Sequence, residues 1–271
     1  MNRSLREMEE KIRLVDAVIY VLDARAPFSC INPAFGKLIA DRPVIYTLNK
    51  ADTVSESDLA PWIDRLSAGN AKAVRMNSTA SGAAKIIADK LFTLCAEKIE
   101  RKKARGIKAV IRAMVIGVPN SGKSTLINNL CGKSKTVTGN RAGVTRAQQW
   151  VKITPYLEVL DTPGTLYPKL DDMNVALNLA FIGSIKDEVV DIYELALELV
   201  KKLYSEGDAL QKRYGAELCG DAVKDLSAIA LKRGLLIKGG QPDTERAAAA
   251  VIDDFRKGRM GKIMLEKAGK K

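Results

Sequence analysis

The octapeptide Gly117-Val-Pro-Asn-Ser-Gly-Lys-Ser124 decides the fold of this chain. It matches the pattern G-x-x-x-x-G-K-[ST] and lies between an apolar run at 109–116 and a helix-forming segment at 123–131. That strand–loop–helix context is the one in which the pattern cradles phosphate groups. Its glycines let successive backbone N–H groups face an anion, and the helix N-terminus adds partial positive charge. The stretch therefore predicts a nucleotide phosphate site rather than a turn without a ligand.

Polar residues of this loop and two downstream positions indicate how phosphate and metal are held. We expect Lys123 to reach the β- and γ-phosphates and the Ser124 hydroxyl to bind Mg²⁺. In Asp161-Thr-Pro-Gly164, the carboxylate would hold Mg²⁺ through water and the Gly164 N–H would contact the γ-phosphate. Thr145 is a candidate for a further Mg²⁺ ligand. The alternatives are a surface turn at 161–164 and a solvated loop threonine at 145. Catalytic roles therefore fall to Lys123, Thr145 and Gly164, and further nucleotide contacts to Asn120, Ser121, Gly122 and Thr125.

A second element, Asn49-Lys50-Ala51-Asp52, follows the apolar run 43–48 and has the pattern N-K-x-D. An ionised Asp52 can accept hydrogen bonds from guanine N1–H and the N2 amino group, whereas adenine offers no such pair of donors. We expect Asn49 to orient the loop and the Lys50 stem to lie along the purine ring. Asn77 and Ser78, after the next strand, are candidates for contacts to guanine O6. A β-to-α turn with a capping Asp remains the alternative for 49–52, and a plain strand-end turn for 77–78.

The order of these elements predicts an unusual connection of a familiar sheet. Apolar runs that predict strands alternate with helical patterns at 57–67, 82–104 and 123–131, which indicates an α/β fold with a mainly parallel sheet covered on both faces. In Ras-like GTPases the P-loop comes first, whereas here N-K-x-D precedes it and D-x-x-G comes last. A sheet tolerates such a circular permutation when its original termini lie close and are joined. The predicted strands are 15–22, 43–48, 73–76, 109–116 and a hairpin of 149–153 with 157–160.

After Pro168 the sequence pattern favours helices instead of alternating strands and helices. The run 189–203 has apolar residues at helical spacing, and an Ala-rich helix is predicted over 244–257 with Asp243 or Thr244 as its N-cap. We place a domain boundary near 165–175. The sequence thus predicts a circularly permuted GTPase domain at 1–170 and a smaller, all-helical domain with a basic tail at 171–271.

With these motifs in place, the sequence resembles the circularly permuted GTPases, and among them those that act in ribosome biogenesis. Besides the elements above, the resemblance rests on Asp23-Ala-Arg-Ala-Pro27, on Gly143-Val-Thr145 and on the C-terminal run 245–263. It spans nearly the whole chain. It implies a GTPase domain followed by a helical RNA-binding domain, and a role in late assembly of the large ribosomal subunit.

The sequence lacks some of the residues that GTP hydrolysis is expected to need. Thr165 and Leu166 follow Gly164, where Ras-like enzymes place a water-positioning Gln, so slow intrinsic turnover is predicted. The resemblance implies another route, in which Asn120 helps to bind K⁺ near the phosphates; an Asn that only forms its own turn is the alternative. Relatives also carry an N-terminal segment with a His implicated in hydrolysis, and this chain has 0 His. Either the chain begins downstream of that segment or another group serves, so no general base is assigned.

The charge balance favours an anionic partner. With 44 Lys and Arg against 32 Asp and Glu, the formal net charge is +12. Basic residues gather at 98–108, at 255–271 and around the switch loop, where Lys133, Lys135, Arg141 and Arg146 lie. Each cluster alone fits a solvated face, but together they favour phosphate contacts with ribosomal RNA. DNA is not expected, and aromatic residues are too few (5%) to favour base stacking.

Composition limits which other classes of protein the chain could belong to. No apolar run approaches the ~20 residues of a membrane span, and the 4 Cys are widely spaced, so a reduced cytoplasmic protein is expected. Three hypotheses stay open. The first is a GTPase that acts on the maturing large subunit, stimulated by the subunit and by K⁺. The second is a GTP-gated RNA-binding placeholder with negligible hydrolysis. The third is an ATP-binding P-loop protein in which N-K-A-D is accidental.

Overall fold

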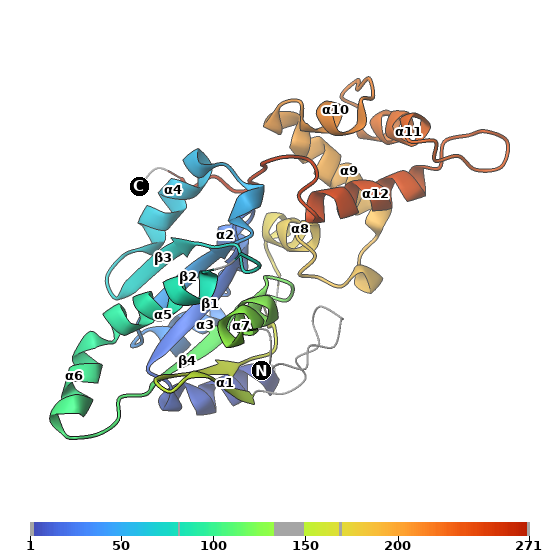
Figure 1. The fold of residues 1–271 in the computed structure, drawn as a ribbon. Coiled ribbons are helices and arrows are strands. Elements are labelled where there is room, and N and C mark those ends of the chain that lie inside the picture. The colour runs from blue at the N-terminus through green and yellow to red at the C-terminus, as the bar shows by residue number, and fades with distance from the viewer. Residues whose placement is uncertain (1–2, 81, 133–148, 168–169, 270–271) are drawn as a thin grey trace.

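A computed structural model describes residues 3–80, 82–132, 149–167 and 170–269. In this part of the chain six strands form one sheet with the order β3-β2-β1-β4-β6-β5 (Figure 1). All neighbouring strands are parallel except β5 and β6, which form an antiparallel hairpin. The predicted mainly parallel sheet is therefore confirmed. The strands are β1 (Ala17–Asp23), β2 (Val44–Asn49), β3 (Ala71–Arg75), β4 (Ile111–Ile116), β5 (Gln149–Thr154) and β6 (Leu157–Asp161).

The central strand β1 shows why both faces of the sheet are covered. All seven of its residues are buried. Val18, Tyr20 and Leu22 belong to one apolar cluster, whereas the alternate residues Ala17, Ile19 and Val21 belong to a second cluster on the opposite face. This period of two is what a strand imposes. A strand that carries apolar residues on both of its faces must bury both faces, as strands of parallel sheets do.

Helices cover the two faces in different ways. On one face lie α5 (Ala83–Leu94) and α7 (Lys123–Cys131), which bury residues such as Ile87 and Leu126. Residues of α1 (Arg3–Lys11), α3 (Ala34–Ile39) and α4 (Glu56–Leu66) join the cluster of the other face, together with the short α2 (Pro27–Cys30). Short 3₁₀ turns η1 (Ile12–Leu14) and η2 (Ala51–Thr53) link these elements.

The continuous helix predicted over 82–104 is wrong in one respect. The chain forms two helices, α5 and α6 (Ala96–Ala104), which meet at Cys95. The Cys95 side chain is buried in the core, but α6 buries none of its residues. Since α6 is rich in Lys and Arg, continuing α5 in a straight line would bring no further burial. The chain bends, and Lys98 and Lys102 pair with Asp16 instead.

Five helices follow the sheet domain in the described residues, and aspartates begin most of them. Asp172, Asp191, Asp221 and Asp243 each accept a backbone N–H of the following helix, as N-cap residues do. The predicted cap Asp243 is thus confirmed, and the helix predicted from 189 begins at Ile192 because Asp191 caps it. These helices are α8 (Met173–Phe181), α9 (Ile192–Leu203), α10 (Ala209–Tyr214), α11 (Ala222–Lys232) and α12 (Thr244–Arg256), with 3₁₀ turns η3 (Asp187–Val189) and η4 (Tyr204–Glu206).

After α12 the chain returns to the sheet domain and ends near α4 (Figure 1). In this C-terminal segment, residues 257–269, the Ile263 N–H donates to Thr53 O at 2.9 Å and the Leu265 N–H to Arg25 O at 2.8 Å. Ile263, Met264 and Leu265 are buried, whereas the neighbouring lysines are exposed. The apolar residues of the predicted basic tail therefore hold the helical region against the sheet domain. No helix among the described residues is long and apolar enough to cross a membrane.

This packing predicts the effect of a single truncation. Met264 is 1% exposed, so Met264→Ala should lower the free energy of unfolding by about 2–4 kcal/mol through the cavity it leaves. Urea unfolding followed by circular dichroism measures the change. The control Leu231→Ala, at a residue that is 56% exposed, should stay within about 0.5 kcal/mol. A similarly small effect of Met264→Ala would mean that the C-terminal segment contributes little to the fold.

Candidate functional site

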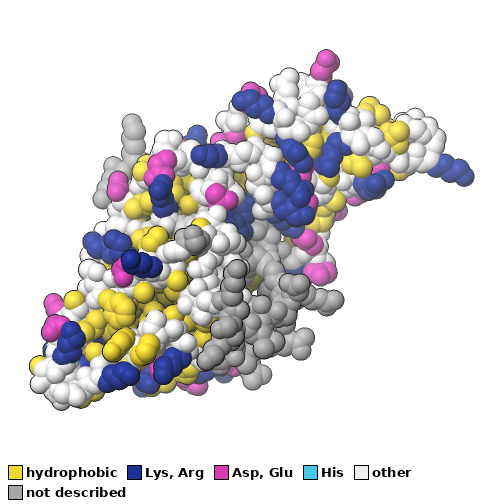
Figure 2. All heavy atoms as spheres, in the orientation of Figure 1, with side chains coloured by type: hydrophobic (Ala, Val, Ile, Leu, Met, Phe, Trp, Pro, Cys, Tyr) yellow, Lys and Arg dark blue, Asp and Glu magenta, His cyan; other side chains and the backbone are white. Residues whose placement is uncertain are grey.

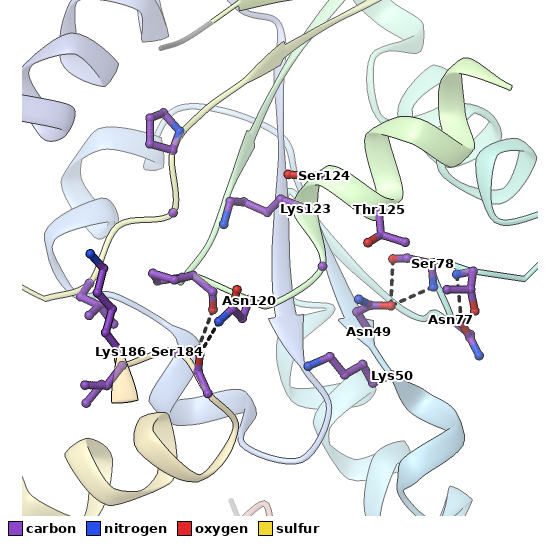
Figure 3. Close-up of a pocket in the computed structure, with 18 of the residues that line it drawn as sticks. Asn49, Lys50, Asn77, Ser78, Asn120, Lys123, Ser124, Thr125, Ser184 and Lys186 are labelled. Atoms are coloured by element: carbon purple, nitrogen blue, oxygen red, sulfur yellow. Dashed lines mark hydrogen bonds between the residues drawn. The ribbon is translucent and has the colours of Figure 1, made fainter. Parts of the chain in front are cut away.

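The carboxyl ends of β2, β4 and β6 open onto a cavity of about 620 Å³ (Figure 3). Residues from five separate segments line it, and ten of the residues predicted from the sequence are among them. The predicted lining residues are Asn49, Lys50, Asn77, Ser78, Asn120, Gly122, Lys123, Ser124, Thr125 and Gly164. The fold thus brings the segments 49–50, 77–78, 120–125 and 164 to one place despite their order in the chain.

The P-loop (117–124) needs its glycines because other groups approach closely. Gly117 has a φ of 148°, and a Cβ there would lie 2.4 Å from the backbone oxygen of Val21. Gly122 has a φ of 101°, and a Cβ there would lie 2.1 Å from Asn49 Nδ2. Asn120 also has a positive φ, 58°. This curled backbone ends at the first turn of α7, whose N–H groups have no partners within the helix and are available to an anion.

Lys123 is buried beneath this loop. Its side chain is 6% exposed, and Nζ donates to Val118 O at 2.8 Å. Burial lowers the pKa of Lys123 from 10.5 to about 8, while the nearby Asp161 carboxylate opposes the shift. A desolvated cation next to the cavity binds phosphate strongly, because there is little water to compete for it.

The Asn49 side chain joins the predicted base loop (49–52) to the P-loop. Its Nδ2 donates to Ser121 O at 2.8 Å. Its Oδ1 accepts from the Ser78 N–H at 2.9 Å and from the Ser78 hydroxyl at 2.8 Å (Figure 3). Ser78 therefore fixes Asn49, and its own N–H is already used. A contact from residues 77–78 to guanine O6 stays a prediction.

Four predicted residues are not among those lining the cavity. Ser121 is buried in the P-loop, where its hydroxyl donates to Val118 O at 3.0 Å. Asp161 is buried at the end of β6, within electrostatic reach of Lys123. Asp52 lies in η2, two residues after Lys50, with its side chain exposed. Thr145 lies outside the described residues, as do Lys133, Lys135, Arg141 and Arg146.

No pattern in the sequence indicates one further wall of the cavity. This wall is the α8–α9 loop (182–191), which contributes Gly183, Ser184, Ile185, Lys186 and Val189. The Ser184 hydroxyl donates to Pro119 O at 2.7 Å, and Asn120 Nδ2 donates to Gly183 O. Gly183, with a φ of 76°, marks only the end of a helix. That this end touches the P-loop follows from tertiary packing alone.

The donor set fits a magnesium ion that is held mostly by phosphate. No group of three or more His, Cys, Asp or Glu among the described residues could hold a metal by itself. Mg²⁺ keeps waters and commonly binds through one or two protein oxygens plus substrate phosphates. The exposed Ser124 hydroxyl in the cavity and the Asp161 carboxylate beside Lys123 provide that kind of partial site.

Sheet order and motif positions define the class. The P-loop follows β4, which has β1 on one side and β6 on the other. The base loop follows β2, and β1 to β3 precede the P-loop in the chain. The parallel pairing of β1 with β4 joins these two halves into one sheet. This arrangement is a P-loop GTPase domain of the circularly permuted type.

Comparison with known proteins gives the family. Residues 112–215 match a family described as 50S ribosome-binding GTPase. The chain is 39% identical to ribosome biogenesis GTPase A of Bacillus cereus, over 98% of this chain and 91% of that protein. It is 30% identical to the Thermotoga maritima protein of the same name, over 98% and 92%. GNP-bound YlqF from T. maritima superposes with a TM-score of 0.67 at 26% identity, covering 98% of each chain. The chain belongs to the ribosome biogenesis GTPase A family.

The buried amine of Lys123 predicts a pH dependence of nucleotide binding. Its pKa of about 8 lies below the ordinary value of 10.5, so in the free protein the positive charge is present below about pH 8 and lost above it. GDP affinity should therefore fall as pH rises from 8 to 9.5, by up to about tenfold per pH unit. Fluorescence titration with a labelled GDP across this range measures it.

Lys123→Met is the matched control, because it removes the titrating amine. It should bind GDP weakly and with little change over the same pH range. An unchanged wild-type affinity between pH 7 and 9.5 would contradict the prediction.

Proposed function

We propose that this chain binds GTP and hydrolyses it to GDP and phosphate while acting in late maturation of the large ribosomal subunit. The observation that carries the proposal is the cavity at which the P-loop and the base loop meet, joined by the Asn49 side chain. A base-selecting loop and a phosphate-binding loop that line the same cavity can hold the two ends of one guanine nucleotide. The family to which the chain belongs supplies the ribosomal context.

Guanine selection would rest on Asp52. The residue follows the left-handed Lys50 (φ 57°), where the chain turns at the end of β2. The Ala51 N–H donates to Met76 O at 3.0 Å, which anchors this turn to the neighbouring segment. An ionised carboxylate on an anchored turn can accept both guanine donors, and it would be left unpaired opposite adenine.

Phosphate chemistry would rest on electrostatic stabilisation and positioning. Lys123 and the N–H groups at the start of α7 would bind the β- and γ-phosphates, and Ser124, Asp161 and Thr145 would hold Mg²⁺, which neutralises charge on the phosphate oxygens. Gly164 would present its N–H to the γ-phosphate. A side chain there is excluded, since a Cβ would lie 2.7 Å from Pro119 Cα. No described residue is assigned as the general base.

Asn120 supports a role for K⁺. Its amide nitrogen is used in the hydrogen bond to Gly183 O, so the amide oxygen is the group left to ligate a cation. Asn120 lies in the P-loop and lines the cavity. A monovalent cation there would stabilise charge that develops between the β- and γ-phosphates, in place of the Gln that this chain lacks after Gly164.

Contact with ribosomal RNA would use a cluster of arginines organised around Asp254. This carboxylate is 1% exposed and pairs with Arg213 at 3.0 Å, Arg233 at 3.3 Å and Arg259 at 3.0 Å. Arg259 also pairs with Asp253 at 3.3 Å, so three guanidinium groups face two negative charges and the cluster keeps a positive surplus. Figure 2 shows Lys and Arg side chains gathered over α12, beside which these residues lie. A surface of this kind fits RNA phosphates.

A GTP-gated RNA-binding placeholder with negligible hydrolysis is the second candidate. It is favoured by Thr165 and Leu166 where Ras-like enzymes carry Gln, and by the absence of His from the sequence. Both functions use the same cavity, and they differ in turnover on the ribosomal subunit.

Nucleotide specificity is tested by Asp52→Asn. An amide offers one donor and one acceptor, which match O2 and N1–H of xanthine instead of the two donors of guanine. We expect GDP affinity to fall about 100-fold and XDP affinity to rise, as measured by competition against a labelled nucleotide. Asp64→Asn, an exposed aspartate on α4, is the control. Equal binding of ADP and GDP by the unaltered chain would support an ATP-binding protein instead.

Turnover separates the two candidate functions. We expect slow GTP hydrolysis by the chain alone, faster hydrolysis with purified large subunits, and a higher rate in K⁺ than in Na⁺ at equal ionic strength. Asn120→Ala should remove the difference between the two salts. No stimulation by subunits would favour the placeholder, and equal rates in both salts would remove the K⁺ assignment.

Within the same assay Arg259→Gln reports on the RNA contact. Arg259 is 47% exposed and lies outside the cavity. The variant should need more subunit for half-maximal stimulation, while the rate without subunits stays as in the unaltered chain.

A further inference from the structure

A buried carboxylate lies just behind the base loop. Asp23, at the end of β1, is 0% exposed and pairs in the sheet with Asn49 at the end of β2. Its oxygens accept from Lys50 Nζ at 2.7 Å, from Arg25 Nη2 at 2.8 Å and from Arg25 Nε at 2.9 Å. The two cations hold the pKa of Asp23 well below its usual range against the effect of burial. Asp23 is therefore ionised at any working pH.

The ion pair with Asp23 restrains the flexible side chain of Lys50 in the base loop. It lines the cavity beside Asn49 (Figure 3), and its side chain is 29% exposed. A lysine has four flexible bonds in its side chain, and ordering them opposes binding if it happens only when the ligand arrives. Because Asp23 holds the ammonium, the stem of Lys50 is already placed at the wall of the cavity before a purine enters.

Arg25 fixes Asp23 from the other side. Arg25 is 1% exposed, and its Nη1 donates to Phe255 O at 2.8 Å and to Arg256 O at 3.2 Å. Its guanidinium also lies 5.0 Å from the centre of the Phe255 ring. These carbonyls belong to the end of α12, where a helix has unpaired acceptors and a negative dipole that suit a cation. The carboxylate is thus held by the helical region as well as by the sheet.

We propose that Asp23 is a positioning residue for guanine-nucleotide binding and that it acts through Lys50. The proposal rests on the function proposed above, because it takes the cavity as the guanine site. Asp23 is not among the residues that line the cavity, so its effect on a ligand must pass through a side chain that does. Lys50 lines the cavity and is bound through its side chain to the Asp23 carboxylate.

A double-mutant cycle tests this. Dissociation constants of a labelled GDP are measured for the full chain and for Asp23→Asn, Lys50→Ala and the double variant. We expect each single change to weaken binding about tenfold, and the double variant to bind no more weakly than Lys50→Ala, since residues that act as a unit are not additive. If the two effects multiply, or if Asp23→Asn alone has no effect, the proposal is overturned. A purely structural defect would weaken binding in both backgrounds.

The matched control is Asp16→Asn at the opposite end of β1. Asp16 is 8% exposed and pairs with Lys98, so it repeats the buried carboxylate–lysine pair far from the cavity. It should lower stability but leave GDP affinity unchanged. Where Asp23→Asn does not fold, Asp23→Asn/Arg25→Gln replaces it in the cycle, because that pair leaves no buried charge without a partner. Failure of the unaltered chain to bind GDP would overturn the proposed function itself, whereas GDP binding with multiplying effects would overturn the role of Asp23 alone.

Discussion

The hydrogen bonds of one buried amide, Asn49, hold the two halves of the sheet domain in register at the cavity. Asn49 is 3% exposed and bonds to Ser121 in the P-loop and to Ser78 after β3. These contacts depend on where three strands end and not on the order in which the chain visits them. A permuted chain can therefore build the same cavity, provided that β1 and β4 still pair side by side.

The helical region is part of the cavity wall and not a separate appendage. One apolar cluster runs from β1 through α8, α9 and α12 to the C-terminal segment. The α8–α9 loop touches the P-loop through Ser184 and Gly183. Arg256 of α12 donates to Ala180 O and pairs with Asp187 in the same loop. The P-loop is thus in direct contact with the loop that joins α8 to α9.

Much of this could be predicted because the determining patterns are local. The strands were found from continuous β-branched and apolar runs, and Asp243 was found as a cap because capping needs only its own helix. The prediction of a single helix over 82–104 was wrong because the spacing of apolar residues does not show where the core ends. In the structure the core ends at Cys95, which is buried, whereas α6 has no buried residues. Asp52 and Asp161 matched their motifs, yet a motif does not say whether a carboxylate faces a cavity, solvent or a neighbouring lysine.

The eight residues of the P-loop and the four of the base loop carry their chemistry in contiguous sequence, so the class of ligand followed from residue types and spacing. Other contacts join residues that lie far apart along the chain, as Arg25 and Phe255 do. These are the contacts of the α8–α9 loop, of the Asp23–Lys50 pair and of the C-terminal segment. No spacing encodes such contacts. They exist because burying apolar surface on both faces of the sheet brings distant segments together, and buried polar groups must then find partners among whatever neighbours the packing provides.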